Sequence, residues 1–266
     1  MNGNSKSSIS GHASYGDMTM PEIRSRTDGL LFLPVGSIEQ HGAHMPVDTD
    51  GLLASKISQR VAAVVGGLVA PPLSYGCRSL PVSGGGELFP GTISLSGETL
   101  TRMVADLLST FARHGHRRII LINGHYENTM FVIEGVKRAQ VEESFQALVI
   151  DWWNILRIDR LQEIFEGEFP GWEAEHAGII ETSLMMHLAP ERVQAERIEN
   201  RIGHIAPPTY TVLPERPGLV DPSGILRTAW GANAELGKEI AEEIETMILG
   251  ILNTEFSEPP STGMPA

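Results

Sequence analysis

Two short pairs of a glutamate and a histidine in this chain have the residue types that bind metal ions. Glu39 and His41 lie two residues apart in "GSIEQHG", and His125 and Glu127 lie two residues apart in "LINGHYENTM". Roughly two such pairs are expected by chance in a chain with 9 histidines. The number of pairs therefore indicates nothing, and only their positions can point to a function.

Both pairs come directly after an apolar run that is typical of a buried strand. The runs are "LLFLPVG" at 30–36 and "RRIILIN" at 117–123. Ligands bind at the carboxyl ends of the strands in open α/β sheets. In an extended chain, residues two apart point to the same side, so each pair presents two potential ligands in one direction. The sequence therefore predicts a metal site at this edge of a sheet.

A third carboxylate, Asp50, follows Glu39 in the same segment, where a helix is expected to begin. Its two oxygens could bridge two cations, although an aspartate at this position is more often a helix cap. Two imidazoles and three carboxylates suit Zn²⁺ or Mn²⁺ better than Ca²⁺ or Cu(I). Such a centre lowers the pKa of water and polarises a carbonyl group. His44 and Asp48 lie in the same loop, and either could replace one of these ligands.

Two further segments contain residues suited to binding or catalysis. "SGGGELFPGT" is rich in glycine but lacks the Lys and Ser/Thr of a phosphate-binding P-loop. We expect its backbone to approach a small ligand closely, with Ser83 donating a hydrogen bond. "GWEAEH" places Trp172, Glu173, Glu175 and His176 where a helix is expected to begin. Either Glu175 and His176 form a general acid–base pair, or Glu175 is simply favoured by the dipole of the helix N-terminus.

The elements that would position these residues alternate between apolar strands and longer helical segments. This alternation is typical of β-α-β units, so we expect an α/β fold with a layered, mostly parallel β-sheet flanked by helices. The expected strands are 30–36, 67–76 running into a turn, 117–123 and 147–153, and the expected helices are 50–66, 96–115, 128–147, 176–188 and 232–252. Five prolines in 201–228 indicate an extended surface arm. We expect one domain over 18–256, with disordered tails at 1–17 and 257–266.

Charge and composition exclude several classes of protein. Asp and Glu outnumber Lys and Arg by 33 to 20, and a formal net charge of -13 disfavours binding to nucleic acid. No stretch reaches the roughly 18 apolar residues of a membrane span, and the N-terminus lacks the apolar core of a signal peptide. Cys77 is the only cysteine, which excludes a disulfide within the chain. We therefore expect a cytoplasmic protein that binds neither nucleic acid nor membranes.

Four motifs together resemble the creatininase family. They are "LPVGSIEQHGAHMPVDTD", "SGGGELFPGT", "NGHYENTMFVIEG" and "GWEAEHAGIIETSLM", and the resemblance covers roughly residues 18–256. It implies a binuclear metal centre, with Zn²⁺ and with Mn²⁺ accepted at one position. In the family's pattern, Glu39 and His125 would hold one metal, His41 and Glu127 would hold the other, and Asp50 would bridge them.

The same resemblance implies an amidohydrolase that opens the ring of creatinine to give creatine, assembled as a homohexamer. The residues that would contact the substrate are Ser83, Tyr126, Trp153, Trp172, Glu173 and His176. Glu175 and His176 would transfer protons, and Glu127 would join them as a catalytic residue. The family carries Asp at the position of Glu173, and one extra methylene can move a carboxylate by about 1 Å. Another small cyclic amide or a formamide is therefore the alternative substrate.

Overall fold

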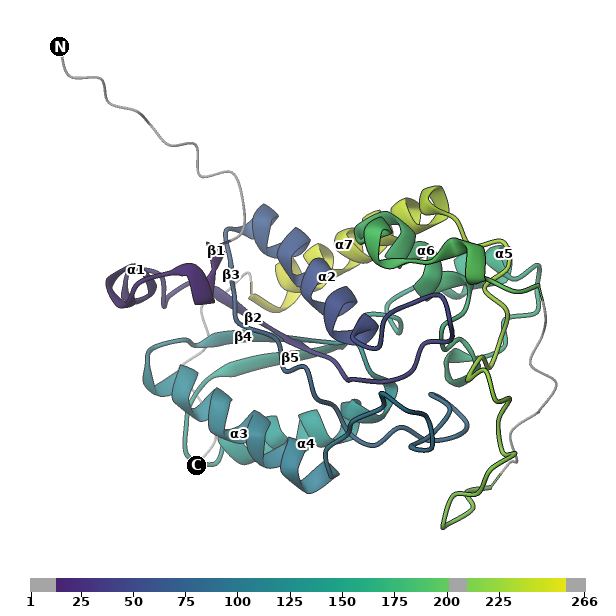
Figure 1. Ribbon diagram of the computed structural model, residues 1–266. Coiled ribbons are helices and arrows are strands. Elements are labelled where there is room, and N and C mark those ends of the chain that lie inside the picture. Colours follow the sequence, from purple (N-terminus) through teal and green to yellow (C-terminus); the bar gives the residue numbers. More distant parts are fainter. Residues whose placement is uncertain (1–12, 201–209, 257–266) are drawn as a thin grey trace.

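The computed structural model describes residues 13–200 and 210–256, which form a parallel β-sheet between two layers of helices (Figure 1). The sheet has five strands in the order β1-β3-β2-β4-β5, and every pairing is parallel. The strands are β1 (Ala13–Ser14), β2 (Leu30–Val35), β3 (Leu68–Val69), β4 (Arg118–Asn123) and β5 (Gln146–Asp151). The predicted α/β fold class is confirmed.

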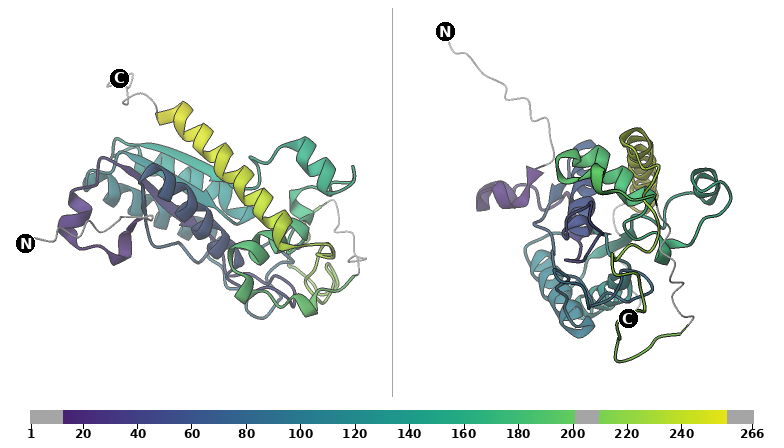
Figure 2. Two further views of the ribbon diagram at one scale, coloured as in Figure 1. Left: turned by 90° about the horizontal axis from the view of Figure 1, so that it is seen from above. Right: turned by 45° about the vertical axis from the view of Figure 1, so that its right-hand side comes forward.

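Helices cover both faces of this sheet. On one face lie α2 (Thr49–Val65), α6 (Ile179–Leu188) and α7 (Ala234–Phe256), and on the other lie α3 (Gly97–Arg113) and α4 (Thr129–Ala139). Seen from above, α2 and α7 lie side by side over the sheet (Figure 2). Two short helices, α1 (Met20–Arg24) and α5 (Ile158–Ile164), lie outside these layers. None of the helices in the described ranges is long and apolar enough to cross a membrane.

Alternating side chains on the central strands form the two halves of the core. Phe32 and Ile120 pack with the layer of α2, α6 and α7, whereas Leu31 and Ile119 pack with the layer of α3 and α4. Because both faces are covered, strands β2 and β4 consist of nearly continuous apolar residues. This burial explains why these two strands were predicted from the sequence almost to the residue.

Several predicted boundaries are wrong. The strand expected at 67–76 is limited to Leu68–Val69, and the helix expected at 232–252 extends to Phe256. The helix expected at 128–147 ends at Ala139, because a turn follows it and β5 already begins at Gln146. The helix expected at 176–188 begins at Ile179. The tail expected at 1–17 is partly structured, because residues 13–17 form β1 and a 3₁₀ turn, and β1 pairs with β3. Residues 1–12, 201–209 and 257–266 lie outside the described ranges, and 210–228 contains no helix or strand.

Close backbone contacts hold the start of α2 against the ends of β2 and β4. A Cβ atom on Gly36, directly after β2, would lie 2.3 Å from the Cα and N of Gly51. A Cβ on Gly124, directly after β4, would lie 2.3 Å from the carbonyl oxygen of Asp50. Only glycine allows these approaches, and they bring the first turn of α2 to the carboxyl edge of the sheet, where both histidine–glutamate pairs lie.

We expect Gly36→Ala to lower the free energy of unfolding by at least about 1–3 kcal/mol, because the new methyl group would overlap the backbone of α2. Gly51→Ala is the matched control: nothing lies within 4 Å of its added Cβ. Because Ala favours helix more than Gly does, this control is expected to stabilise the protein by about 0.5–1 kcal/mol. Urea unfolding of both variants measures the difference, and equal stabilities would contradict the proposed packing of α2.

Candidate metal centre

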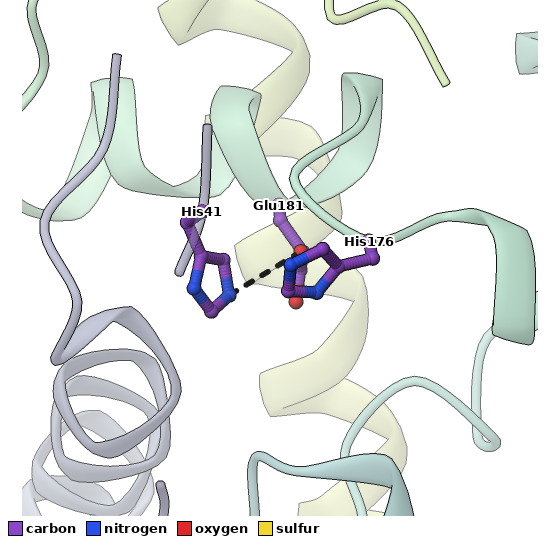
Figure 3. Close-up of side chains that lie close together, drawn as sticks. All are labelled: His41, His176 and Glu181. Atoms are coloured by element: carbon purple, nitrogen blue, oxygen red, sulfur yellow. Dashed lines mark ion pairs between the residues drawn. The ribbon is translucent and has the colours of Figure 1, made fainter. Parts of the chain in front are cut away.

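Six buried side chains at the carboxyl edge of the sheet form two neighbouring groups of potential metal ligands. Within each group, one nitrogen or carboxylate oxygen from every residue lies within 4.8 Å of the others. The first group is Glu39, Asp50 and His125, and the second is His41, His176 and Glu181 (Figure 3).

Asp50 lies between the two groups and faces both. Its Oδ1 is 3.1 Å from Nε2 of His41, and its Oδ2 is 3.2 Å from Nδ1 of His125. Asp50 is the second residue of α2, and the N-cap position belongs to Asp48, so the alternative reading of Asp50 as a helix cap is wrong. One carboxylate thus offers an oxygen to each group, which is the arrangement expected of a ligand that bridges two cations.

The first group is completed by Glu39, whose Oε2 is 2.9 Å from Nδ1 of His125. In the second group, Oε2 of Glu181 is 3.8 Å from Nε2 of His41 and accepts a hydrogen bond from the amide of Ala177 at 2.6 Å. Glu181 was not among the predicted ligands. It is the third residue of α6, and no histidine pair or strand end beside it marks it as a ligand in the sequence.

Glu127, expected as a ligand, lies beside His125 and outside both ligand groups. Its Oε2 is 3.2 Å from Nε2 of His125, and its Oε1 accepts hydrogen bonds from the amide of Leu80 at 3.0 Å and from the hydroxyl of Ser83. Within the described ranges, Glu181 rather than Glu127 stands next to His41. The expectation assumed extended chain after His125; Tyr126–Asn128 forms a 3₁₀ turn instead, yet the side chains of His125 and Glu127 still meet.

The charges in the two groups require compensation by positive charge. Burial opposes protonation of His41 and His125, but nearby carboxylates outweigh it. Asp50, Glu181 and Glu39 raise the pKa of His41 to about 10. Glu39, Asp50 and Glu127 raise the pKa of His125 well above its usual value. Burial also raises the pKa of Glu181 to about 7. The carboxylates therefore draw protons onto the histidines, and a divalent cation would supply the same positive charge and release those protons.

Two buried atoms support this fit to a cation. Nε2 of His41 and Oδ2 of Asp50 have no hydrogen-bond partner among the described residues, although oppositely charged groups lie nearby. Buried polar atoms are almost always hydrogen-bonded, so unpaired atoms that converge from different elements need another partner. With imidazole nitrogens and carboxylate oxygens as donors, Zn²⁺ and Mn²⁺ fit the site.

A cavity opens beside the two groups. Aromatic side chains form much of its wall: the rings of Tyr126 and Trp153 are stacked with centroids 6.2 Å apart, and Trp172 packs edge-on against Trp152. Ser83, Glu175, Glu127 and His176 also line it. Trp152 was not predicted to line the site, because a turn directly after β5 lets two successive tryptophans reach the same cavity.

Glu173 does not line this cavity but binds a residue that does. The hydroxyl of Tyr126 donates a hydrogen bond to Oε1 of Glu173 at 2.9 Å. Burial and the nearby Glu173 carboxylate raise the pKa of Tyr126 to about 12, so its hydroxyl stays protonated as a donor. Glu173 thereby fixes the aromatic ring at the wall of the cavity.

His176 and Glu175 have separate environments. Nε2 of His176 donates a hydrogen bond to the carbonyl oxygen of Gln40 at 2.6 Å, which leaves Nδ1 as the nitrogen with the free lone pair. Burial and the neighbouring His41 lower the pKa of His176 to about 3. Glu175 instead accepts the amide of Ile180 at 2.8 Å, and burial together with Glu181 raises its pKa well above the usual value. Through this hydrogen bond, Glu175 supports the first turn of α6.

The two alternative ligands from the same loop are engaged elsewhere. Nε2 of His44 lies 2.9 Å from the hydroxyl of Thr182. Asp48 forms an ion pair with Arg192 at 2.8 Å on the surface. Neither residue belongs to a ligand group.

Comparison with known proteins agrees with this geometry. The family model described as "Creatininase: Creatinine amidohydrolase" matches residues 16–252. The chain belongs to the creatininase family. It is 40% identical over 256 residues to the creatinine amidohydrolase of Pseudomonas putida, covering 92% of this chain and 97% of that protein. It is also 31% identical to a mycofactocin precursor peptide peptidase of Mycolicibacterium smegmatis, over 81% of each chain.

Solved structures of creatininase share the fold. A crystal structure of creatinine amidohydrolase matches with a TM-score of 0.89 and 40% identity, covering 93% of this chain and 99% of that one. Two similar chains, with TM-scores of 0.88 and 0.89, are described as an Mn creatininase and as a mutant creatininase of Zn-Zn type. The creatininase family thus includes hydrolases with different substrates, among them the peptidase, and this chain is a metal-dependent hydrolase of that family.

Proposed function

We propose that this creatininase-family protein is a binuclear metal-dependent amidohydrolase that reversibly opens the cyclic amide of creatinine to give creatine. The observation that carries the proposal is the position of Asp50 between two ligand groups beside a cavity walled by aromatic rings. The 40% identity to the Pseudomonas putida enzyme over nearly the whole chain supports the same substrate.

Two cations would share Asp50. Glu39 and His125 would complete one site, and His41 and Glu181 would complete the other. Zn²⁺ and Mn²⁺ are the proposed ions, as described for similar structures. When bound, such ions activate water and polarise a carbonyl group.

The residues of the chain would orient the ring and handle its protons. Creatinine is planar and partly cationic, so the faces of Trp153 and Trp172 suit it, because indole attracts cations. In the hydrolysis, a water oxygen adds to the ring carbonyl carbon, the bond from this carbon to the ring nitrogen breaks, and the nitrogen takes a proton. Nδ1 of His176 is the ring nitrogen available to pass that proton, because Nε2 donates a hydrogen bond to the carbonyl of Gln40.

The proposed role of Glu175 differs from the one expected. The sequence suggested that it works with His176 in proton transfer. Its carboxyl accepts a hydrogen bond from Ile180 instead, and among the described residues no hydrogen bond joins it to His176. We propose that Glu175 stabilises the turn that carries His176 and Glu181. The homohexamer and the cytoplasmic location stay predictions.

A second candidate substrate is another small cyclic amide or a formamide. The bond from Tyr126 to Glu173 favours keeping this alternative, because the longer side chain of Glu173 sets the position of a ring in the cavity wall. Turnover of creatinine, other small lactams, N-formyl compounds and a short peptide by the metal-loaded protein separates these candidates. We expect creatine from creatinine at the highest kcat/KM. Turnover of a different amide without formation of creatine would contradict the proposal.

A further inference from the structure

A buried serine hydroxyl contacts one of the proposed metal ligands from the side opposite His125. Ser79 is 1% exposed, and its Oγ donates a hydrogen bond to Oε1 of Glu39 at 2.6 Å. The other oxygen of the same carboxylate, Oε2, faces His125 Nδ1 at 2.9 Å. The two oxygens of Glu39 therefore have different partners: one is taken by Ser79, and the other faces the ligand group.

The direction of this hydrogen bond is set by a glycine amide. The amide of Gly86 donates to Oγ of Ser79 at 3.2 Å. Because the amide can only donate and a carboxylate can only accept, the serine oxygen accepts from Gly86 and its hydroxyl donates to Glu39. Ser79 can therefore serve as a fixed donor to Glu39.

The glycine-rich segment fits tightly around this contact. A Cβ atom on Gly84 would lie 1.5 Å from Oε1 of Glu39 and 2.3 Å from Oγ of Ser79, so no side chain can replace this glycine without displacing both. Glu87 closes the segment, because its Oε1 accepts hydrogen bonds from the amide of Ser79 at 3.1 Å and from the hydroxyl of Ser94 at 2.8 Å. The glycine-rich segment thus encloses a proposed metal ligand and its hydrogen-bond donor.

We propose that Ser79 is a positioning residue for the metal centre, whose hydroxyl fixes Glu39 so that Oε2 faces the cation shared with Asp50 and His125. The inference rests on the proposed metal centre and deepens it. Partners that hold a metal ligand from behind change metal affinity by about 10- to 100-fold when they are removed. The effect of Ser79 is directed to one of the two cations, because it bonds to Glu39 and to no residue of the other group.

Competition between the full-length protein and a chromogenic chelator for Zn²⁺ tests the inference without any substrate. The matched pair is Ser79→Ala and Ser94→Ala, which remove the same hydroxyl from two serines bonded to Glu87. We expect Ser79→Ala to weaken the binding of one Zn²⁺ by about 10- to 100-fold. The affinity for the other Zn²⁺ should change by less than a tenth of that factor. Ser94→Ala is expected to bind both ions as the wild type does.

The second Zn²⁺ serves as an internal control, because its retention shows that Ser79→Ala is folded. Equal affinities of Ser79→Ala and the wild type at both sites would overturn the inference and leave the proposed function standing. The same loss in Ser94→Ala would also overturn it, since the effect would then belong to the loop as a whole. A wild-type protein that binds no Zn²⁺ would overturn the proposed function together with the inference.

Discussion

Asp50→Asn is expected to remove both metal ions from the protein and to abolish turnover. Asparagine keeps the shape of the side chain but loses the charge, and its nitrogen would replace one of the two oxygens that face His41 and His125. Loss of a partner behind a ligand already lowers metal affinity by about 10- to 100-fold, so the loss of a shared ligand should exceed this at both sites. Elemental analysis of the dialysed protein and an activity assay measure the two effects.

Asp48→Asn provides the control for this variant. Asp48 lies two residues earlier and is paired on the surface with Arg192, an interaction that contributes at most about 1 kcal/mol to stability. It should retain two metal ions and normal activity. If Asp50→Asn also retained two ions per chain, Asp50 would not bridge the centre.

His176→Ala is expected to lower kcat by about 10²- to 10⁴-fold while both metal ions stay bound. The reason is that Nε2 is held by the carbonyl of Gln40 and Nδ1 remains to exchange a proton with the substrate. Metal content and kcat are measured on the same sample. His187→Ala is the control, because His187 also lies in this part of the chain but outside the residues that line the cavity.

The structure also places His176 next to His41 and Glu181, which gives the experiment two distinct outcomes (Figure 3). Retention of both ions with slow turnover assigns His176 to proton transfer. Loss of one ion would make it a ligand of the second site and would contradict the proton-transfer role.

The sequence predicted the elements whose signal is local. Strands β2 and β4 are buried on both faces, so their apolar runs stand out, and the histidine–glutamate pairs follow directly after them. Asp50 was found for the same reason, since it begins the next helix. The pairing of β1 with β3 was missed, because two-residue strands at the edge of a sheet depend on tertiary contacts rather than on a pattern.

The side chains that surround the site were predicted less completely than its location. Glu181 comes from a helix far along the chain, and only folding brings it to His41. Glu127 as a metal ligand stays a prediction, and a 3₁₀ turn replaces the extended chain assumed after His125. The contact between Ser79 and Glu39 likewise joins two loops that no short motif links. Residue types and strand ends therefore indicate where a site forms, whereas its inner contacts depend on how separate segments pack.

The most direct test of the binuclear centre is metal analysis of the purified protein combined with measurement of creatine formed from creatinine before and after chelation. We expect two divalent ions per chain, formation of creatine, loss of this activity when the ions are removed, and its return when Zn²⁺ or Mn²⁺ is added. Formation of creatine at an unchanged rate by protein shown to be free of metal would contradict the central claim, as would a metal-loaded protein that forms no creatine.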